Sequence, residues 1–130
     1  MANIKLKSIS VGENIIVSSP NGQISVINIV DIITSKGFPA LHPKLGVLVR
    51  VVGDVGTYQE TLEIISVEDE KIIATAKGNI EIKNKDEGNN FAADFVNVPF
   101  PKPGKYWLKV SVDGEILTDK SIHFIDLRPA

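Results

Sequence analysis

Apolar residues recur along this chain at every second position rather than at the spacing of a helix. In residues 105–112 the even positions, from Tyr106 to Val112, are apolar, and the odd positions other than Trp107 are polar. This alternation is typical of a strand with one buried face. Helical spacing of apolar residues does not persist over roughly 10 residues anywhere, so we expect no helix longer than a single turn.

The same pattern predicts a series of short strands separated by turn-forming residues. They span residues 4–17, 23–34, 45–52, 60–67, 71–76, 79–83, 91–98, 105–112 and 116–124. Asn21-Gly22, between the first two apolar runs, is a strong hairpin signal, and Gly78 marks a bulge or a break. Seven to nine short strands of this kind predict an all-β fold, a two-layer antiparallel β-sandwich, with a barrel as the alternative.

Composition supports a strand-rich fold. Ile and Val together number 32, whereas Leu and Ala together number 15, and β-branched side chains fit a pleated sheet better than a helix. The 130 residues have the length of one domain, and a domain of this size buries roughly two thirds of the surface of its unfolded chain. Because no internal repeat or linker divides the chain, we predict a single domain, residues 1–130.

Charge and cysteine content exclude several classes of partner. Lys and Arg number 14 and Asp and Glu number 16, without a basic run that could neutralise successive phosphates, so we expect no nucleic-acid binding. Cysteine is absent, which removes disulfides and thiolate metal sites. The N-terminal segment lacks a signal-peptide pattern, and no stretch approaches the roughly 20 apolar residues of a membrane helix. We therefore expect no membrane association and a soluble, cytoplasmic protein.

The last two predicted strands flank Asp113-Gly114, and two registers are possible there. A two-residue turn would pair Val112 with Glu115 and direct Glu115 into the core. A type I turn with a bulge at the glycine would pair Ser111 with Glu115 and place Phe124 in the core instead. We predict the bulged turn.

Three prolines in residues 99–103 precede this hairpin. A Pro-Phe-Pro-Lys-Pro run could adopt the polyproline II conformation that recognition domains bind. The run lies between two strong strand signals, however, and proline cannot donate a backbone hydrogen bond to a sheet. We predict a structural corner that ends one strand and begins the next.

The segment from Pro103 to Val110 resembles the penultimate strand of immunoglobulin-like and fibronectin type III-like sandwiches. In those folds a tyrosine near the start of the strand packs at a corner, and its hydroxyl bonds to the backbone. The resemblance implies this role for Tyr106 and an immunoglobulin-like β-sandwich. The chain has neither a cysteine pair nor a core tryptophan on an earlier strand, so the antibody-type domain itself is not implied.

More of the chain is similar to an uncharacterised family of small stand-alone bacterial β-sandwich proteins. The matching pieces are residues 21–24 leading into an apolar strand with Asp31, the segment from Phe38 to Leu45, and the proline-rich turn with the final hairpin. The resemblance supports the fold and implies no activity.

The sequence offers little material for catalysis or metal binding. His42 and His123 are the only histidines, and no nearby pattern supplies the further ligands of a zinc site. A G-x-S-x-G nucleophile elbow and a glycine-rich phosphate loop are also absent. The acidic loop 85–90 lacks the spacing of an EF-hand and is predicted to be a solvated turn. We predict no metal, no cofactor and no catalytic residue.

Asp31 and Arg50 each interrupt a segment that is otherwise apolar on both faces. A carboxylate in such a place needs a partner or a proton, and a guanidinium offers two parallel donors to it. We therefore predict an ion pair between them with a structural role, a ligand-binding role being the alternative.

Three functions are compatible with this sequence. The first is a non-catalytic β-sandwich that binds a protein partner or a copy of itself, because Trp107 and the segment with Phe38, Leu41 and His42 present apolar surface. The second is a carbohydrate-binding module in which Trp107 and Tyr58 supply stacking faces. The third, supported least, is a hydrolase that uses His42. We expect the first, and therefore no enzymatic activity.

Overall fold

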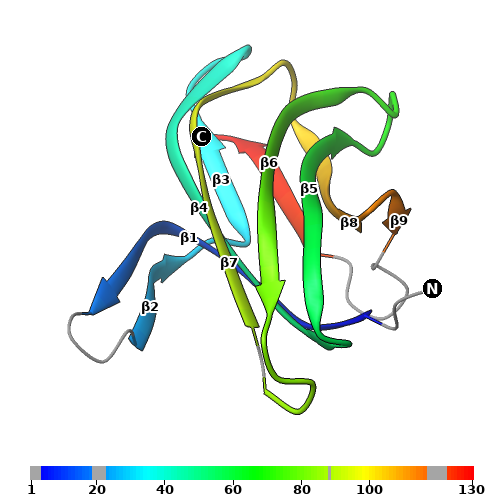
Figure 1. Ribbon diagram of the computed structural model, residues 1–130. Helices are drawn as coiled ribbons and strands as arrows, with labels where there is room; N and C mark the ends of the chain where they lie inside the picture. Colours follow the sequence, from blue (N-terminus) through cyan, green and yellow to red (C-terminus); the bar gives the residue numbers. More distant parts are fainter. Residues whose placement is uncertain (1–3, 19–22, 88, 117–122) are drawn as a thin grey trace.

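The chain folds into strands throughout the part that the computed structural model describes, which is residues 4–18, 23–87, 89–116 and 123–130. No helix is present in these ranges (Figure 1). The strands are β1 (Ile4–Ser18), β2 (Gln23–Ile29), β3 (Ile32–Ser35), β4 (Ala40–Gly53), β5 (Gly56–Ser66), β6 (Ile72–Ile82), β7 (Asn89–Phe100), β8 (Gly104–Val112), β9 (Glu115–Ile116) and β10 (His123–Pro129).

These strands form two sheets. Sheet A has the order β2-β1-β4-β7, and sheet B has the order β3-β10-β8-β5-β6, with β9 paired to β8. Strands β6 and β7 lie next to each other where the chain passes from sheet B to sheet A, and Figure 1 shows the two sheets facing each other. The all-β prediction and the prediction of two packed sheets are confirmed.

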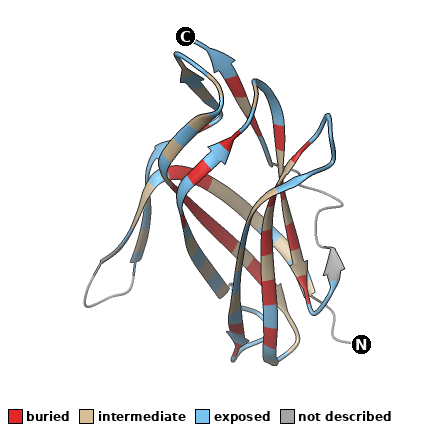
Figure 2. Ribbon diagram, turned by 90° about the horizontal axis from the view of Figure 1, so that it is seen from above, coloured by how far each residue is buried: buried red, intermediate tan, exposed pale blue. Residues whose placement is uncertain are grey.

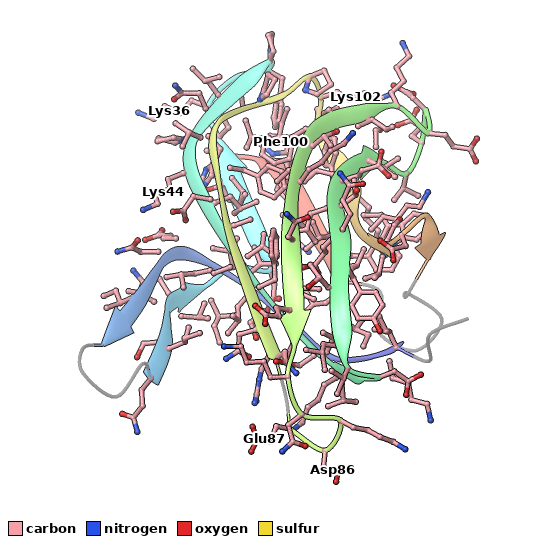
Figure 3. The ribbon with its side chains drawn as sticks, viewed as in Figure 1. Lys36, Lys44, Asp86, Glu87, Phe100 and Lys102 are labelled. Atoms are coloured by element: carbon pink, nitrogen blue, oxygen red, sulfur yellow. The ribbon has the colours of Figure 1, made fainter. Side chains whose placement is uncertain are left out.

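The core lies between the sheets because alternate residues of each strand face inward. Figure 2 shows buried positions alternating with exposed ones along the strands. Side chains with no exposed surface include Val11, Leu45, Val47, Val49, Val51, Leu62, Ile64, Phe100, Leu108, Val110 and Ile125. Phe100 lies between the layers (Figure 3), with its ring edge-on to that of Tyr106 at 4.9 Å between centroids.

Two details of the predicted architecture are wrong. The described residues form ten strands rather than seven to nine: the predicted strand 23–34 is the two strands β2 and β3, the predicted strand 116–124 overlaps both β9 and β10, and the predicted strands 71–76 and 79–83 are the single strand β6. The sandwich is also not wholly antiparallel, since β3 runs parallel to β10. The parallel pair arises because the chain crosses from sheet A to sheet B between β2 and β3 and reaches the edge of sheet B beside the last strand.

The predicted bulged turn at Asp113-Gly114 is also wrong. Val112 pairs with Glu115, and both turn residues have positive φ, 48° at the aspartate and 86° at the glycine. This is the two-residue hairpin turn that Asp-Gly favours. The register of β10 nevertheless places Ile125 in the core, and Phe124 is 42% exposed rather than buried.

The proline-rich segment is a corner between the two sheets, as predicted. Strand β7 of sheet A ends at Phe100, and β8 of sheet B begins at Gly104. Lys102 fastens this corner to the β5–β6 turn, since its Nζ lies 2.6 Å from Asp69 and 3.4 Å from Glu68 (Figure 3). The hydrogen bond to Asp69 raises the pKa of Lys102.

Both tyrosines of the chain bond to the backbone four residues upstream. The Tyr106 hydroxyl donates to the carbonyl of Lys102 at 2.6 Å, and the Tyr58 hydroxyl donates to the carbonyl of Asp54 at 2.8 Å. The bond implied for Tyr106 is therefore confirmed. Burial raises the pKa of the Tyr106 hydroxyl, which keeps it protonated as a donor. Each tyrosine fixes the turn before its strand, β8 for Tyr106 and β5 for Tyr58.

We expect Tyr106→Phe to lower the free energy of unfolding by about 1–2 kcal/mol, because a partly buried carbonyl loses its donor. Tyr58→Phe should have a similar effect, since its bond has the same geometry. Urea denaturation followed by circular dichroism measures both. A loss below about 0.3 kcal/mol, small on the scale of a single hydrogen bond, would show that these hydroxyls do not hold the turns.

Candidate functional site

The outer face of sheet B carries a row of apolar side chains that crosses four strands. Trp107 of β8 pairs with Ile65 of β5 on one side and with Phe124 of β10 on the other. Ile65 in turn pairs with Ile72 of β6. Directly paired residues project from the same face of a sheet, so the four side chains form a continuous apolar row.

A second, shorter row lies beside the first. Val67 follows two residues after Ile65, and its amide donates to the carbonyl of Lys105. Lys105 pairs with Asp126, which pairs with Ile32 of β3. The six apolar residues of the two rows are called the Trp107 face: Ile32, Ile65, Val67, Ile72, Trp107 and Phe124.

The Trp107 face is exposed at its borders and half-buried at its centre. Ile72 is 56% exposed, Ile32 48% and Val67 44%, whereas Trp107 is half-buried. The indole N–H of Trp107 is buried and has no acceptor in the described part of the chain. Lys105 covers part of Phe124, with its Nζ 5.6 Å from the ring centroid, a cation–π contact.

The structure does not bring the other predicted binding residues to the Trp107 face. Phe38 packs against the core, and Leu41 is 64% exposed on β4 of sheet A. His42 is half-buried, and its Nε2 is enclosed without a hydrogen-bond partner among the described residues. The four predicted binding residues therefore do not form one site, and no acid among the described residues is hydrogen-bonded to His42 Nε2 to make it a general base.

Trp107 and Tyr58 do not form the stacking platform expected of a carbohydrate-binding module. Tyr58 is 8% exposed and belongs to the core, with its hydroxyl bonded to Asp54. Trp107 lies on the opposite face of the same sheet. The alternation along β5 and β8 places the two rings on different sides.

Arg50 has an amide partner where an ion pair with Asp31 was expected. Its Nε donates to Asn90 Oδ1 at 2.9 Å. Asp31 is exposed where the chain passes from β2 to β3, and its carbonyl accepts from the amide of Asp126. The sequence placed Asp31 within a strand, whereas the structure places it between β2 and β3.

The buried carboxyl of Glu60 is a feature that the sequence reasoning missed. The residue has no exposed surface, and neither carboxyl oxygen has a hydrogen-bond partner in the described part of the chain. It projects into the core from β5, opposite Gly78 and Val112. Burial raises the pKa of Glu60 to about 7. The sequence did contain a signal for this burial, because Glu60 lies two residues before Leu62 and therefore on the apolar face of the strand.

The described residues contain no group of three His, Asp or Glu side chains placed to share a metal ion. Asp86 and Glu87 lie at the tip of the β6–β7 loop, away from the sheets (Figure 3). The loop is closed by its own bonds, in which Asn84 Oδ1 accepts from the amide of Asp86 and Asn89 Nδ2 donates to the carbonyl of Glu87. In the same part of the chain, no helix is long and apolar enough to cross a membrane.

These features define an all-β protein of two packed sheets with an apolar outer face on one of them. A family model described as a family of unknown function, DUF6941, matches residues 12–125. The chain therefore belongs to this family. No curated protein is similar enough to the chain to match.

Proposed function

We propose that this protein is non-catalytic and acts by binding protein through the Trp107 face, with a second copy of the chain as the partner. The observation that carries the proposal is the apolar row Ile72–Ile65–Trp107–Phe124, which runs across four strands and has exposed residues at both ends. A continuous apolar patch on a sheet face commonly marks an interface. Water leaves this patch only when another surface covers it.

The charges around the row favour a second copy. Glu63 of β5 pairs with Lys109 of β8, with 3.9 Å between carboxylate and ammonium, and Lys105 pairs with Asp126. These four side chains place two acidic and two basic groups next to the apolar row, and the Arg128 guanidinium lies 3.6 Å from Asp126 beside them. A two-fold axis brings the same surface together twice, and a face with both signs can meet its copy without net repulsion.

Two observations support a non-catalytic role: the surroundings of His42 and the placement of the described His, Asp and Glu side chains. His42 has no hydrogen-bonded carboxylate in the described part of the chain, and no cluster of ligating side chains forms there. General acid–base catalysis requires a positioned group within hydrogen-bond reach of the substrate. The apolar Trp107 face provides a contact surface rather than a set of positioned acids and bases.

Sedimentation velocity over a concentration series tests the proposal. We expect the wild type to reach the dimer mass, and Val67→Asp to raise the dimer dissociation constant roughly 10-fold or more, because a carboxylate would be buried at the interface. Val96→Asp is the matched control, since Val96 is 66% exposed on β7 of sheet A. A wild type that stays monomeric at every concentration, or equal weakening by the two variants, would contradict the proposal.

A further inference from the structure

A cleft of about 460 Å³ lies in the angle between the β1–β2 hairpin and the outer face of sheet A. Figure 1 shows the hairpin standing out from the body of the sandwich. The cleft lies on sheet A, whereas the Trp107 face lies on sheet B. The two sites share no residue. Its lining residues are Gln23, Ile24, Ser25, Leu48, Arg50 and Asn90.

The hairpin is held in this position by contacts at its base. Gly12 pairs both with Gly46 of β4 and with Ile29 of β2, so β1 changes partner there. A Cβ at Gly12 would lie 2.6 Å from the carbonyl oxygen of Ile27, and a Cβ at Gly46 would lie 2.9 Å from the Ile15 side chain. Gly12 therefore allows the two strands of the hairpin to approach each other closely, and Gly46 allows the hairpin to approach β4.

A polar contact and an apolar one complete the base of the hairpin. Lys44 Nζ donates to Asn14 Oδ1 at 2.8 Å. Leu48 is only 8% exposed although it does not belong to the core cluster. Its burial on the outer side of sheet A follows from the hairpin beside it. The cleft consequently has an apolar floor at Leu48 and an apolar wall at Ile24.

Among the described residues that line this cleft, Arg50 is the only charged one. Its Nε donates to Asn90 Oδ1, which fixes the plane of the guanidinium group. No Asp or Glu in the described part of the chain forms an ion pair with it. The other guanidinium N–H groups remain as donors, and a guanidinium presents them in a fork that matches a carboxylate.

We propose that this cleft binds a small organic acid, with the carboxylate on Arg50 and the apolar part against Leu48 and Ile24. The volume is in the range of small-molecule sites, which is roughly 300–1,000 Å³. A single cation balances one negative charge, so a monocarboxylate fits better than a phosphate dianion. The side chains of Ser25 and Asn90 supply further polar groups at the rim.

Side-chain NMR of arginine provides a direct test, because the chain has only two arginines, Arg50 and Arg128. Titration with sodium hexanoate should shift the Nε–H signal of Arg50 and the amide signals of Ser25, Leu48 and Asn90. Hexanol, the neutral analogue, should shift them far less, and inorganic phosphate should bind more weakly than hexanoate. Equal shifts with hexanol, stronger binding of phosphate, or shifts outside the cleft would overturn the proposal.

Two variants identify the residue responsible. Arg50→Met keeps the length of the side chain and should weaken hexanoate binding roughly 10-fold or more, the loss expected when a hydrogen bond to a charged group is removed. Arg128→Met is the matched control, since Arg128 lies on β10 with its guanidinium 3.6 Å from Asp126, and it should leave the binding unchanged. Unchanged affinity in a folded Arg50→Met variant would refute the assignment. The hexanoate and hexanol titrations of the wild type decide the question even if that variant does not fold.

Discussion

Replacing Glu60 by glutamine should make this protein progressively more stable relative to the wild type as the pH rises from about 4 to about 8. Burial raises the pKa of Glu60 from its ordinary 4.5 to about 7, so the folded state binds this proton more tightly than the unfolded chain. The contribution of Glu60 to stability therefore falls as the pH rises between these two values and stays low above pH 7. The difference in free energy of unfolding between variant and wild type should shift by about 3 kcal/mol across this range.

Denaturant titrations of the two proteins at several pH values measure this difference. Glu81→Gln is the matched control, because it makes the same substitution at an exposed position of β6, and it should not reproduce the gain in stability expected for Glu60→Gln. A constant difference for Glu60→Gln would mean that the Glu60 carboxyl has a partner or contacts water.

The second large effect concerns the core between the sheets. We expect Leu108→Ala to lower the free energy of unfolding by about 2–5 kcal/mol, because the removed methyl groups leave a cavity in a fully packed site. Leu108 has no exposed surface, whereas Leu41 is 64% exposed. The same substitution at Leu41 should change stability by less than about 0.5 kcal/mol.

Chemical denaturation of both leucine variants gives the comparison directly. The pair is informative because the side-chain change is identical, whereas Leu108 of sheet B is buried and Leu41 of sheet A is exposed. Similar losses at Leu108 and Leu41 would be incompatible with two sheets that bury one face each.

Local alternation was sufficient to predict a chain built of strands and the inward side of β8, but not every strand boundary: residues 23–34 hold two strands, and the predicted strands 71–76 and 79–83 are the single strand β6. Tyr106 and Leu108 lie two residues apart on an apolar series, and this period alone determines which face of the strand they share. The Tyr106 corner was implied by the resemblance of its strand to immunoglobulin-like sandwiches, and its hydrogen bond spans only four residues.

Interactions between distant strands could not be predicted in this way. Gly78 was expected to mark a bulge or a break, but it pairs regularly with Glu60 within β6. It is glycine because a Cβ would lie 2.3 Å from the ring of Phe91. The partner of Arg50 was missed for the same reason, because Asn90 reaches it across the β4–β7 pairing. Such contacts depend on strand order and register, which alternation does not specify.

The candidate surface was predicted only at its centre. Alternation placed Trp107 on the outer side of its strand, and this is correct. Ile65, Ile72 and Phe124 join it through cross-strand pairing, and Phe124 had been assigned to the core because the turn at Asp113-Gly114 was predicted with the wrong register. A surface made of one residue from each of several strands appears only when the strands are in place.

Fluorescence quenching of Trp107 tests the central proposal most directly, because this is the only tryptophan in the chain and it lies at the middle of the proposed interface. Acrylamide quenching should weaken as the protein concentration passes through the range in which sedimentation shows the dimer forming. In the Val67→Asp variant, acrylamide quenching at the same concentrations should remain as strong as in a dilute solution. If acrylamide quenching stays constant while the sedimenting mass doubles, the dimer contact lies elsewhere on the molecule. If the mass never doubles, a second copy is not the partner.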